Sequence, residues 1–225
     1  MTSCQVAGCW GEIDSTGFCN VCGSADWDAR VGRGAEDLVA APLSKPPYSH
    51  PGSPAFAPTF DREPLGVGIY LVLLNLSGHG ADAVRIVAAC YQKAEHRRTQ
   101  VERLLLSHDW RPQLVGCVAT LVAERSDRPL GVLIGAARRS SWVSPQILAT
   151  VSLATPPGWE VQIEEAILER QDPKAAAALV HLRTGRSPEL VALAQQDTDG
   201  GGEIARHWRD HIKVAFDGAG VTRDW

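Results

Sequence analysis

From residue 63 onward, apolar residues recur every three or four positions, which is the spacing of one helix face. The stretch 159–170 shows this spacing clearly. Asp172-Pro173 and Ser187-Pro188 each combine an N-cap residue with a proline that suits the first helical turn. The pattern predicts helices over the following ranges: 64–76, 82–97, 101–106, 110–123, 129–139, 142–154, 159–170, 173–182, 190–194 and 203–216.

One short phrase occurs twice in the middle of this region. Trp110 and Trp142 each precede a Pro-Gln pair, which begins at Pro112 in the first copy and at Pro145 in the second, and a small apolar run follows. The tryptophans are 32 residues apart and the Pro-Gln pairs 33 apart. This period is typical of stacked helix pairs. Both tryptophans are therefore expected to pack between neighbouring repeats.

The short helices and short turns, with no segment that alternates like a strand, predict an all-α fold. Asp82 is expected to cap the helix over 82–97, and residues 197–202 to form a loop before the last helix. The period and the prolines at helix starts resemble those of HEAT or armadillo-like α-solenoids, here in degenerate form. An irregular helical bundle is the alternative.

Composition divides the chain into three parts. Residues 1–27 hold a cysteine cluster and are expected to form a small zinc-ribbon or knuckle. Residues 28–62 are rich in proline, glycine and serine, which indicates a linker with a few aromatic residues that touch the main domain. Residues 63–225 are expected to form the helical-repeat domain, where Cys90 and Cys117 fall on apolar helix faces as buried, inert thiols.

The N-terminal cysteines have the spacing of a metal site. Cys4 and Cys9 form one close pair, and Cys19 and Cys22 form a second pair, with nine residues between the two pairs. Two such pairs can offer four thiolates to one tetrahedral Zn²⁺, which would then supply much of the folding energy of so short a module. A disulfide or a redox-active Cys19-x-x-Cys22 pair is the alternative interpretation.

The run Cys4-x4-Cys9-Trp-Gly, followed by Gly-Phe-Cys19-x2-Cys22-Gly, resembles the small N-terminal zinc module of actinobacterial protein kinase G-like Ser/Thr kinases. Similar modules precede some metal-dependent Ser/Thr phosphatases. The resemblance covers about a tenth of the chain, and the remainder has no Gly-rich phosphate loop, His-Arg-Asp loop or Asp-Phe-Gly motif. It therefore implies a companion or regulator in such a bacterial signalling system and no kinase activity.

Charge and hydropathy narrow the classes of partner. The net charge of −4, and the lack of lysine and arginine within residues 1–27, give no support to nucleic-acid binding. No apolar run reaches the ~20 residues of a membrane-spanning helix. No basic segment followed by an apolar stretch opens the chain, so a cytoplasmic location is expected. Protein partners fit these features best.

Three pairs of residues in the helical region carry potential chemistry. His207 and His211 share a helix face and could bind a metal, although a polar surface also explains them. Arg97 and Arg98 lie in a modest basic patch with Lys93, His96 and Arg103, which is either a solvated helix face or a contact for phosphate or acidic peptide. Arg138 and Arg139 end a helix, where the helix dipole favours cations.

These observations favour a non-enzymatic adaptor that binds protein partners through a zinc knuckle and a helical-repeat surface. One alternative is an enzyme whose active site forms between helices, which would require a pocket where groups such as Arg138, Gln146 and His181 converge. A second alternative is nucleic-acid binding on the concave face of the repeats.

Overall fold

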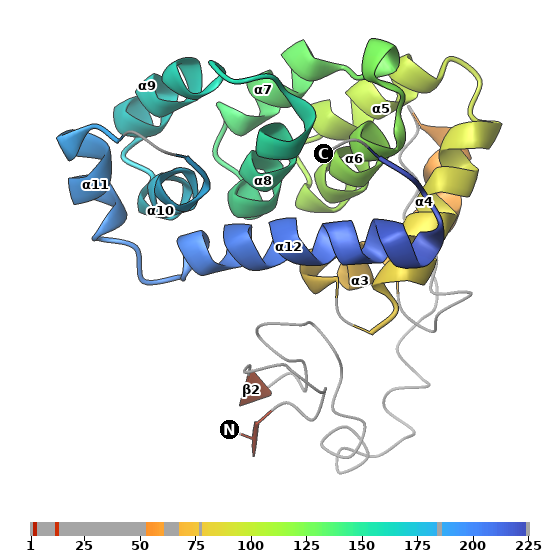
Figure 1. The fold of residues 1–225 in the computed structure, drawn as a ribbon, viewed down its shortest axis with the longest axis horizontal. Helices are drawn as coiled ribbons and strands as arrows, with labels where there is room; N and C mark the ends of the chain where they lie inside the picture. The colour runs from red at the N-terminus through yellow and green to blue at the C-terminus, as the bar shows by residue number, and fades with distance from the viewer. Residues whose placement is uncertain are drawn as a thin grey trace.

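The computed structural model describes residues 53–60, 68–76, 78–183 and 186–223, together with the backbone of two short strands. These strands, β1 (Thr2–Ser3) and β2 (Glu12–Ile13), pair antiparallel. All other regular structure in the described residues is helical, which confirms the all-α prediction for this part of the chain (Figure 1). The helices are η1 (Pro54–Thr59), α3 (Ile69–Asn75), α4 (Gly80–Lys93), α5 (Arg97–Leu106), α6 (Trp110–Val122), η2 (Arg125–Asp127), α7 (Leu130–Ala137), α8 (Ser144–Ala154), α9 (Glu160–Arg170), α10 (Pro173–Leu182), α11 (Pro188–Ala194) and α12 (Gly201–Ala219).

Side-chain caps start several helices where the sequence predicts them. The Asp172 carboxylate accepts a hydrogen bond from the Ala175 amide at 3.0 Å, and the Ser187 hydroxyl accepts one from Leu190 at 3.1 Å. The prediction for Asp82 is wrong. The helix α4 begins two residues earlier, and Asp82 lies in its first turn, where the carboxylate pairs with Arg85 and is favoured by the helix dipole.

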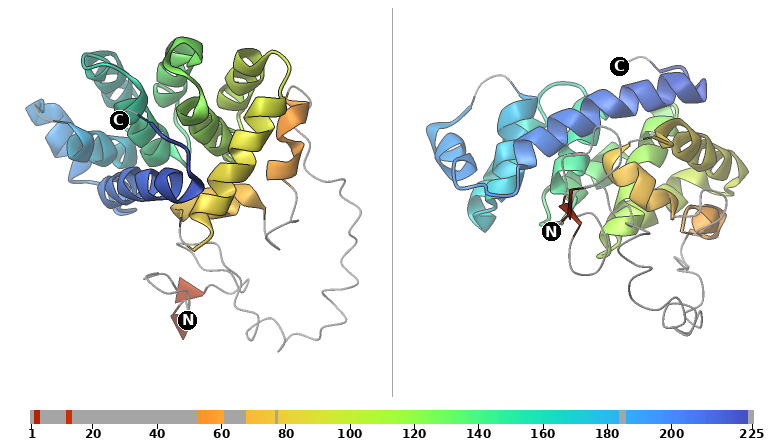
Figure 2. Two further views of the ribbon diagram at one scale, coloured as in Figure 1. Left: turned by 45° about the vertical axis from the view of Figure 1, so that its right-hand side comes forward. Right: turned by 90° about the horizontal axis from the view of Figure 1, so that it is seen from below.

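The helices form two rows with a long helix across them. α5, α7 and α9 make up the first row, and α6, α8 and α10 lie in a second row beneath it (Figure 1). α12 crosses under the second row and packs against α10, α8 and α4, with α3 beside it (Figure 2). It begins two residues before the predicted start and extends three residues past the predicted end.

The start of α12 lies close to α10 because two glycines leave room. A Cβ atom on Gly201 would approach the carbonyl oxygen of Lys174 to 2.2 Å, and one on Gly202 would approach Nδ1 of His181 to 2.2 Å. Further along α12, the Trp208 side chain is 1% exposed, and its indole N–H donates to the Leu73 carbonyl oxygen at 2.8 Å. The helix is thus held at both its start and its middle.

Residues at equivalent positions of the sequence repeat lie beside each other. The rings of Trp110 and Trp142 have centroids 5.1 Å apart, so the two tryptophans contact each other. Cys117 and Thr150, which are 33 positions apart, are both fully buried, in α6 and α8, and these two helices pack against each other. The sequence period therefore corresponds to the step from one helix of the second row to the next.

Part of the range expected to be a linker packs on the helical body. Phe56, in η1, is fully buried against α4. The Ser53 hydroxyl donates to the Gln100 carbonyl oxygen at 2.7 Å, and the Ala55 amide donates to the Gln100 side chain at 3.2 Å. The aromatic contact expected of this segment is therefore present at Phe56.

Candidate functional site

The four predicted zinc ligands, Cys4, Cys9, Cys19 and Cys22, lie outside the described residues. Within the residues that are described, no three His, Cys, Asp or Glu side chains are grouped to hold a metal ion. The described helices also include none long and apolar enough to cross a membrane. Cys90 and Cys117 are buried thiols as predicted, and desolvation raises the pKa of Cys90 to about 11 and that of Cys117 to about 12.

His207 and His211 lie together on the exposed side of α12. Their rings stack with centroids 3.7 Å apart, and Nδ1 of His211 is 2.9 Å from the His207 carbonyl oxygen. Burial and the neighbouring His211 lower the pKa of His207. The pair has the expected common face, but no third ligand joins it within the described part of the chain.

The basic patch around Arg97 is largely engaged within the protein. The Arg97 guanidinium lies over the Tyr91 ring, 5.5 Å from its centroid, and donates to the Gln92 carbonyl oxygen at the end of α4. Arg98 forms an ion pair with Glu102 at 3.0 Å, one helical turn away. These contacts favour the interpretation of a solvated helix face over a ligand site.

An aromatic row crosses the N-terminal ends of α3, α6 and α8. We define it as Tyr70, Trp110 and Trp142. The Tyr70 and Trp110 rings meet edge to face with centroids 5.7 Å apart, and Trp110 is next to Trp142. Tyr70 and Trp110 are partly buried, whereas Trp142 is 54% exposed. The row thus presents one large indole to solvent on an otherwise packed base.

Two cations flank the aromatic row, and each also has a carboxylate partner. Arg111 lies over the rings of Tyr70 and Trp110, at 5.5 and 4.7 Å from their centroids, and pairs with Asp109 at 3.3 Å. Lys174 lies 5.4 Å from the Trp142 centroid and 3.8 Å from Asp199. Cation–π contacts of this kind hold the rings in place. Because a carboxylate lies beside each of the two cations, the aromatic row carries little net charge.

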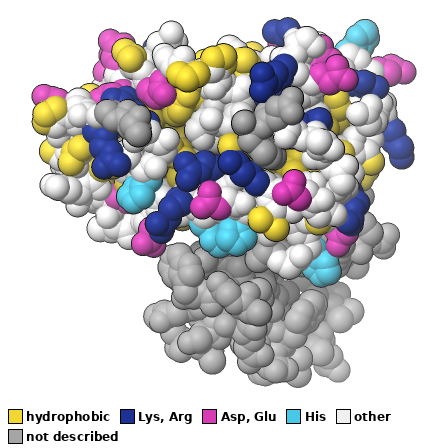
Figure 3. Space-filling view, viewed as in Figure 1, with side chains coloured by type: hydrophobic (Ala, Val, Ile, Leu, Met, Phe, Trp, Pro, Cys, Tyr) yellow, Lys and Arg dark blue, Asp and Glu magenta, His cyan; other side chains and the backbone are white. Residues whose placement is uncertain are grey.

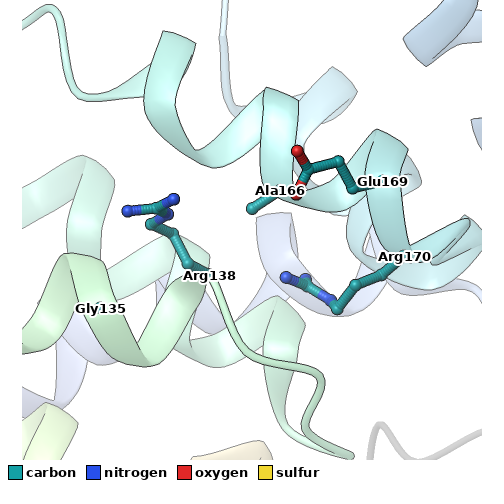
Figure 4. Close-up of a pocket in the computed structure, with 5 residues that line it drawn as sticks. All are labelled: Gly135, Arg138, Ala166, Glu169 and Arg170. Carbon is teal, nitrogen blue, oxygen red and sulfur yellow. The ribbon is translucent and has the colours of Figure 1, made fainter.

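A second site lies in the first row of helices. An open cavity of about 370 Å³ between α7 and α9 has Gly135, Arg138, Ala166, Glu169 and Arg170 in its wall. We call it the arginine pocket. The Arg138 and Arg170 side chains come from the ends of the two helices and extend toward the space between them, with the Glu169 carboxylate on the α9 side (Figure 4).

The two arginines are arranged differently with respect to solvent. Arg138 is exposed, whereas Nε and Nη2 of Arg170 are buried without a hydrogen-bond partner in the described residues. Burial and the like charge of Arg138 lower the pKa of Arg170. Nε–H and Nη2–H form one edge of the guanidinium, the fork that binds both oxygens of a carboxylate or phosphate.

The pocket expected for an enzyme from Arg138, Gln146 and His181 does not form. Of these three residues, Arg138 alone is among those that line the arginine pocket. Gln146 is buried in the second row, where its amide donates to the Leu74 carbonyl oxygen at 3.2 Å. His181 lies against Gly202, with Nδ1 3.0 Å from the Ala177 carbonyl oxygen. Gln146 and His181 belong to helices that pack on α12, so this observation, which would have favoured the enzyme alternative, is not made at these three residues.

The chain matches no protein-family model, and searches of curated proteins and of solved structures likewise find no match.

Sequence reasoning missed Lys174 and Arg170, although the period of the repeat indicates both. Lys174 stands 32 positions after Trp142, and Arg170 stands 32 positions after Arg138. Because one period is one step along a row of helices, these residues lie beside their equivalents. Extending the period beyond the two Trp-Pro-Gln copies would have found them.

Proposed function

We propose that this protein is a non-enzymatic adaptor that binds a partner protein through the aromatic row. The observation that carries the proposal is the half-exposed indole of Trp142, supported from behind by Trp110. Tryptophan is among the residues that contribute most binding energy at protein interfaces, particularly where its surroundings are already packed. The docking segment is expected to contain proline, because flat aromatic surfaces recognise extended proline-containing chains with little loss of entropy.

The charge distribution supports a protein partner over a nucleic acid. Arg111 and Lys174 each have a carboxylate beside them, so the row has little charge left to neutralise phosphates. On the face that carries α12, basic side chains gather along the middle with acidic side chains directly beside them (Figure 3). Within α12 itself, Arg209 forms an ion pair with Asp210 at 3.3 Å.

The proposal extends to the architecture and to the N-terminal module. The 32-residue step between packed helices supports degenerate HEAT or armadillo-like repeats. Cys4, Cys9, Cys19 and Cys22 would hold a structural Zn²⁺ and provide a second docking module. The resemblance of this module supports a role for the adaptor in a bacterial Ser/Thr kinase–phosphatase signalling system.

Truncating Trp142 should abolish partner binding without unfolding the protein. A photo-crosslinking residue at Ser140, which is exposed beside the row, should capture a protein that the same residue at Val161 does not. With that partner purified, Trp142→Ala should weaken the affinity about thirtyfold, as expected for a central tryptophan. Val161→Ala, which removes an even more exposed apolar side chain on α9, should leave the affinity unchanged.

Equal capture from both positions, or an unchanged affinity for Trp142→Ala, would contradict the docking role. Capture of a nucleic acid with a steep dependence of affinity on salt would favour the alternative of nucleic-acid binding.

Metal analysis tests the N-terminal module separately. The purified wild-type chain should contain about one zinc, as a Cys₄ site binds, and Cys19→Ser should lose it. The helical signal in circular dichroism should stay the same, because the described helices do not involve this segment. A wild-type chain without zinc would disprove the module, and zinc that survives in Cys19→Ser would direct attention to His207 and His211.

A further inference from the structure

Two histidines of α12 lie side by side on an exposed face of the helix. The rings of His207 and His211 stack with centroids 3.7 Å apart, and both residues are exposed. Residues four apart in a helix project from the same face, and two imidazoles at this spacing can bind one metal ion together. We call these two residues the histidine pair.

The backbone of α12 orients His211 in the way that metal-binding histidines are commonly oriented. Nδ1 of His211 lies 2.9 Å from the His207 carbonyl oxygen. In the tautomer that donates from Nδ1 to this oxygen, Nε2 keeps a lone pair for a metal ion. Histidine ligands usually donate their other ring N–H to a carbonyl oxygen or a carboxylate, which fixes the tautomer. The helix therefore supplies this supporting hydrogen bond before any metal binds.

His207 is held in the protonation state that binds metals. Partial burial and the neighbouring His211 lower its pKa. Because a metal ligand must be deprotonated, a histidine that is neutral at pH 7 does not have to release a proton when the ion binds. The torsion that turns a histidine ring is broad, so the two exposed rings can turn their lone pairs toward one ion.

A comparison with His181 shows what is particular to the pair. Nδ1 of His181 lies 3.0 Å from the Ala177 carbonyl oxygen, so this histidine has the same local contact as His211. No second histidine stands four residues before or after it. The local contact thus orients a ring at both positions, and only α12 adds a second imidazole beside it.

The charges of α12 do not oppose a cation. The helix carries equal numbers of acidic and basic side chains, so its net charge does not repel a dication. The acidic residues are Glu203, Asp210 and Asp217, and the basic residues are Arg206, Arg209 and Lys213.

We propose that the histidine pair binds one divalent transition-metal ion through one nitrogen of each ring. Imidazole ligands suit Zn²⁺, Ni²⁺ and Cu²⁺, whereas Mg²⁺ and Ca²⁺ prefer oxygen. No third His, Cys, Asp or Glu joins the pair within the described residues, so water fills the remaining positions around the ion. The site connects two successive turns of α12 and is separate from the N-terminal cysteines and from the aromatic row.

Titration of the full chain with Ni²⁺, followed by NMR of the histidine ring protons, tests the proposal at each histidine. The paramagnetic ion should shift or broaden the His207 and His211 signals together. This should occur at a concentration at least about tenfold below the one that affects His181, because two linked ligands bind more tightly than one. In His207→Ala, the His211 signal should become no more sensitive than that of His181, and His211→Ala should have the same effect on His207.

A thermal melt and a control variant complete the test. Ni²⁺ should raise the Tm of the wild-type chain more than that of His211→Ala, because an ion that binds only the folded helix stabilises it. His108→Ala removes an exposed histidine outside α12 and should leave the response of the pair unchanged. Circular dichroism confirms that each variant is folded.

Three results would overturn the proposal. They are a pair that responds no more strongly than His181, a response of only one of the two rings, and an unchanged response of one ring after the other is replaced. Because the signals come from the rings themselves, the outcome does not depend on whether the cysteines hold zinc or whether a partner binds the aromatic row.

Discussion

Replacing Trp208 by alanine should lower the free energy of unfolding by about 3–5 kcal/mol, the usual cost of removing a buried tryptophan. Trp208 is 1% exposed and lies where α12 crosses the second row of helices. Its loss leaves a large cavity and also removes the donor to the Leu73 carbonyl oxygen, which lies near the end of α3. Because small domains have a total stability of about 5–15 kcal/mol, urea unfolding should show a large shift of the midpoint.

Two comparison variants separate packing from the hydrogen bond. Trp208→Phe keeps most of the ring volume but has no N–H, so it should cost about 1–3 kcal/mol. Val214→Ala, on the same helix but 68% exposed, should change stability by less than about 0.5 kcal/mol. If Trp208→Ala costs no more than Val214→Ala, then α12 is not packed across the rows as described.

Gly201→Ala should destabilise the protein by about 2–3 kcal/mol, against the usual trend for a helix. Alanine at a helical glycine normally stabilises by about 0.5–1 kcal/mol. At Gly201 the added methyl would lie 2.2 Å from the Lys174 carbonyl oxygen, and because this oxygen belongs to the backbone of α10 it cannot rotate away. The start of α12 must therefore move off α10, and overpacking of this kind carries a cost of that size.

Gly131→Ala is the matched control for this prediction. Gly131 is exposed in α7, and a Cβ atom there would meet nothing within 4 Å. The substitution should raise the free energy of unfolding by up to about 1 kcal/mol, because it only restricts the unfolded chain. Parallel thermal or urea melts of the two variants should shift in opposite directions. A stabilising effect at both positions would show that α12 does not approach α10 so closely.

The position of α12 bears on where a partner can bind. In stacked helix pairs the second row of helices commonly provides the binding surface, and here α12 covers much of it along α8 and α10. The aromatic row and the arginine pocket both lie at other places, on helix ends and in the first row. The last helix thus covers α8 and α10 and leaves helix ends, such as those that carry the aromatic row, as the proposed binding surface.

Helix caps and the spacing of apolar residues, both local features of the sequence, predicted most of the helices. Asp172 and Ser187 cap the helices that follow them, and the 32-residue period correctly indicates that Trp110 packs against Trp142. These features depend on residues that are near in sequence or that are related by a repeat, so pattern alone suffices. The zinc ligands Cys4, Cys9, Cys19 and Cys22 remain a prediction from spacing.

Tertiary structure alone decided how the last helix is placed and which helix ends the arginine side chains contact. The amphipathic pattern of α12 predicts a helix with a buried face, but it does not say which helices cover that face. The hydrogen bonds from Arg139 to the Leu105 and Leu106 carbonyl oxygens join the ends of α7 and α5, which are distant in sequence. Side-chain hydrogen bonds between residues more than 30 positions apart follow from how the helices pack, whereas helix formation follows mainly from the local sequence.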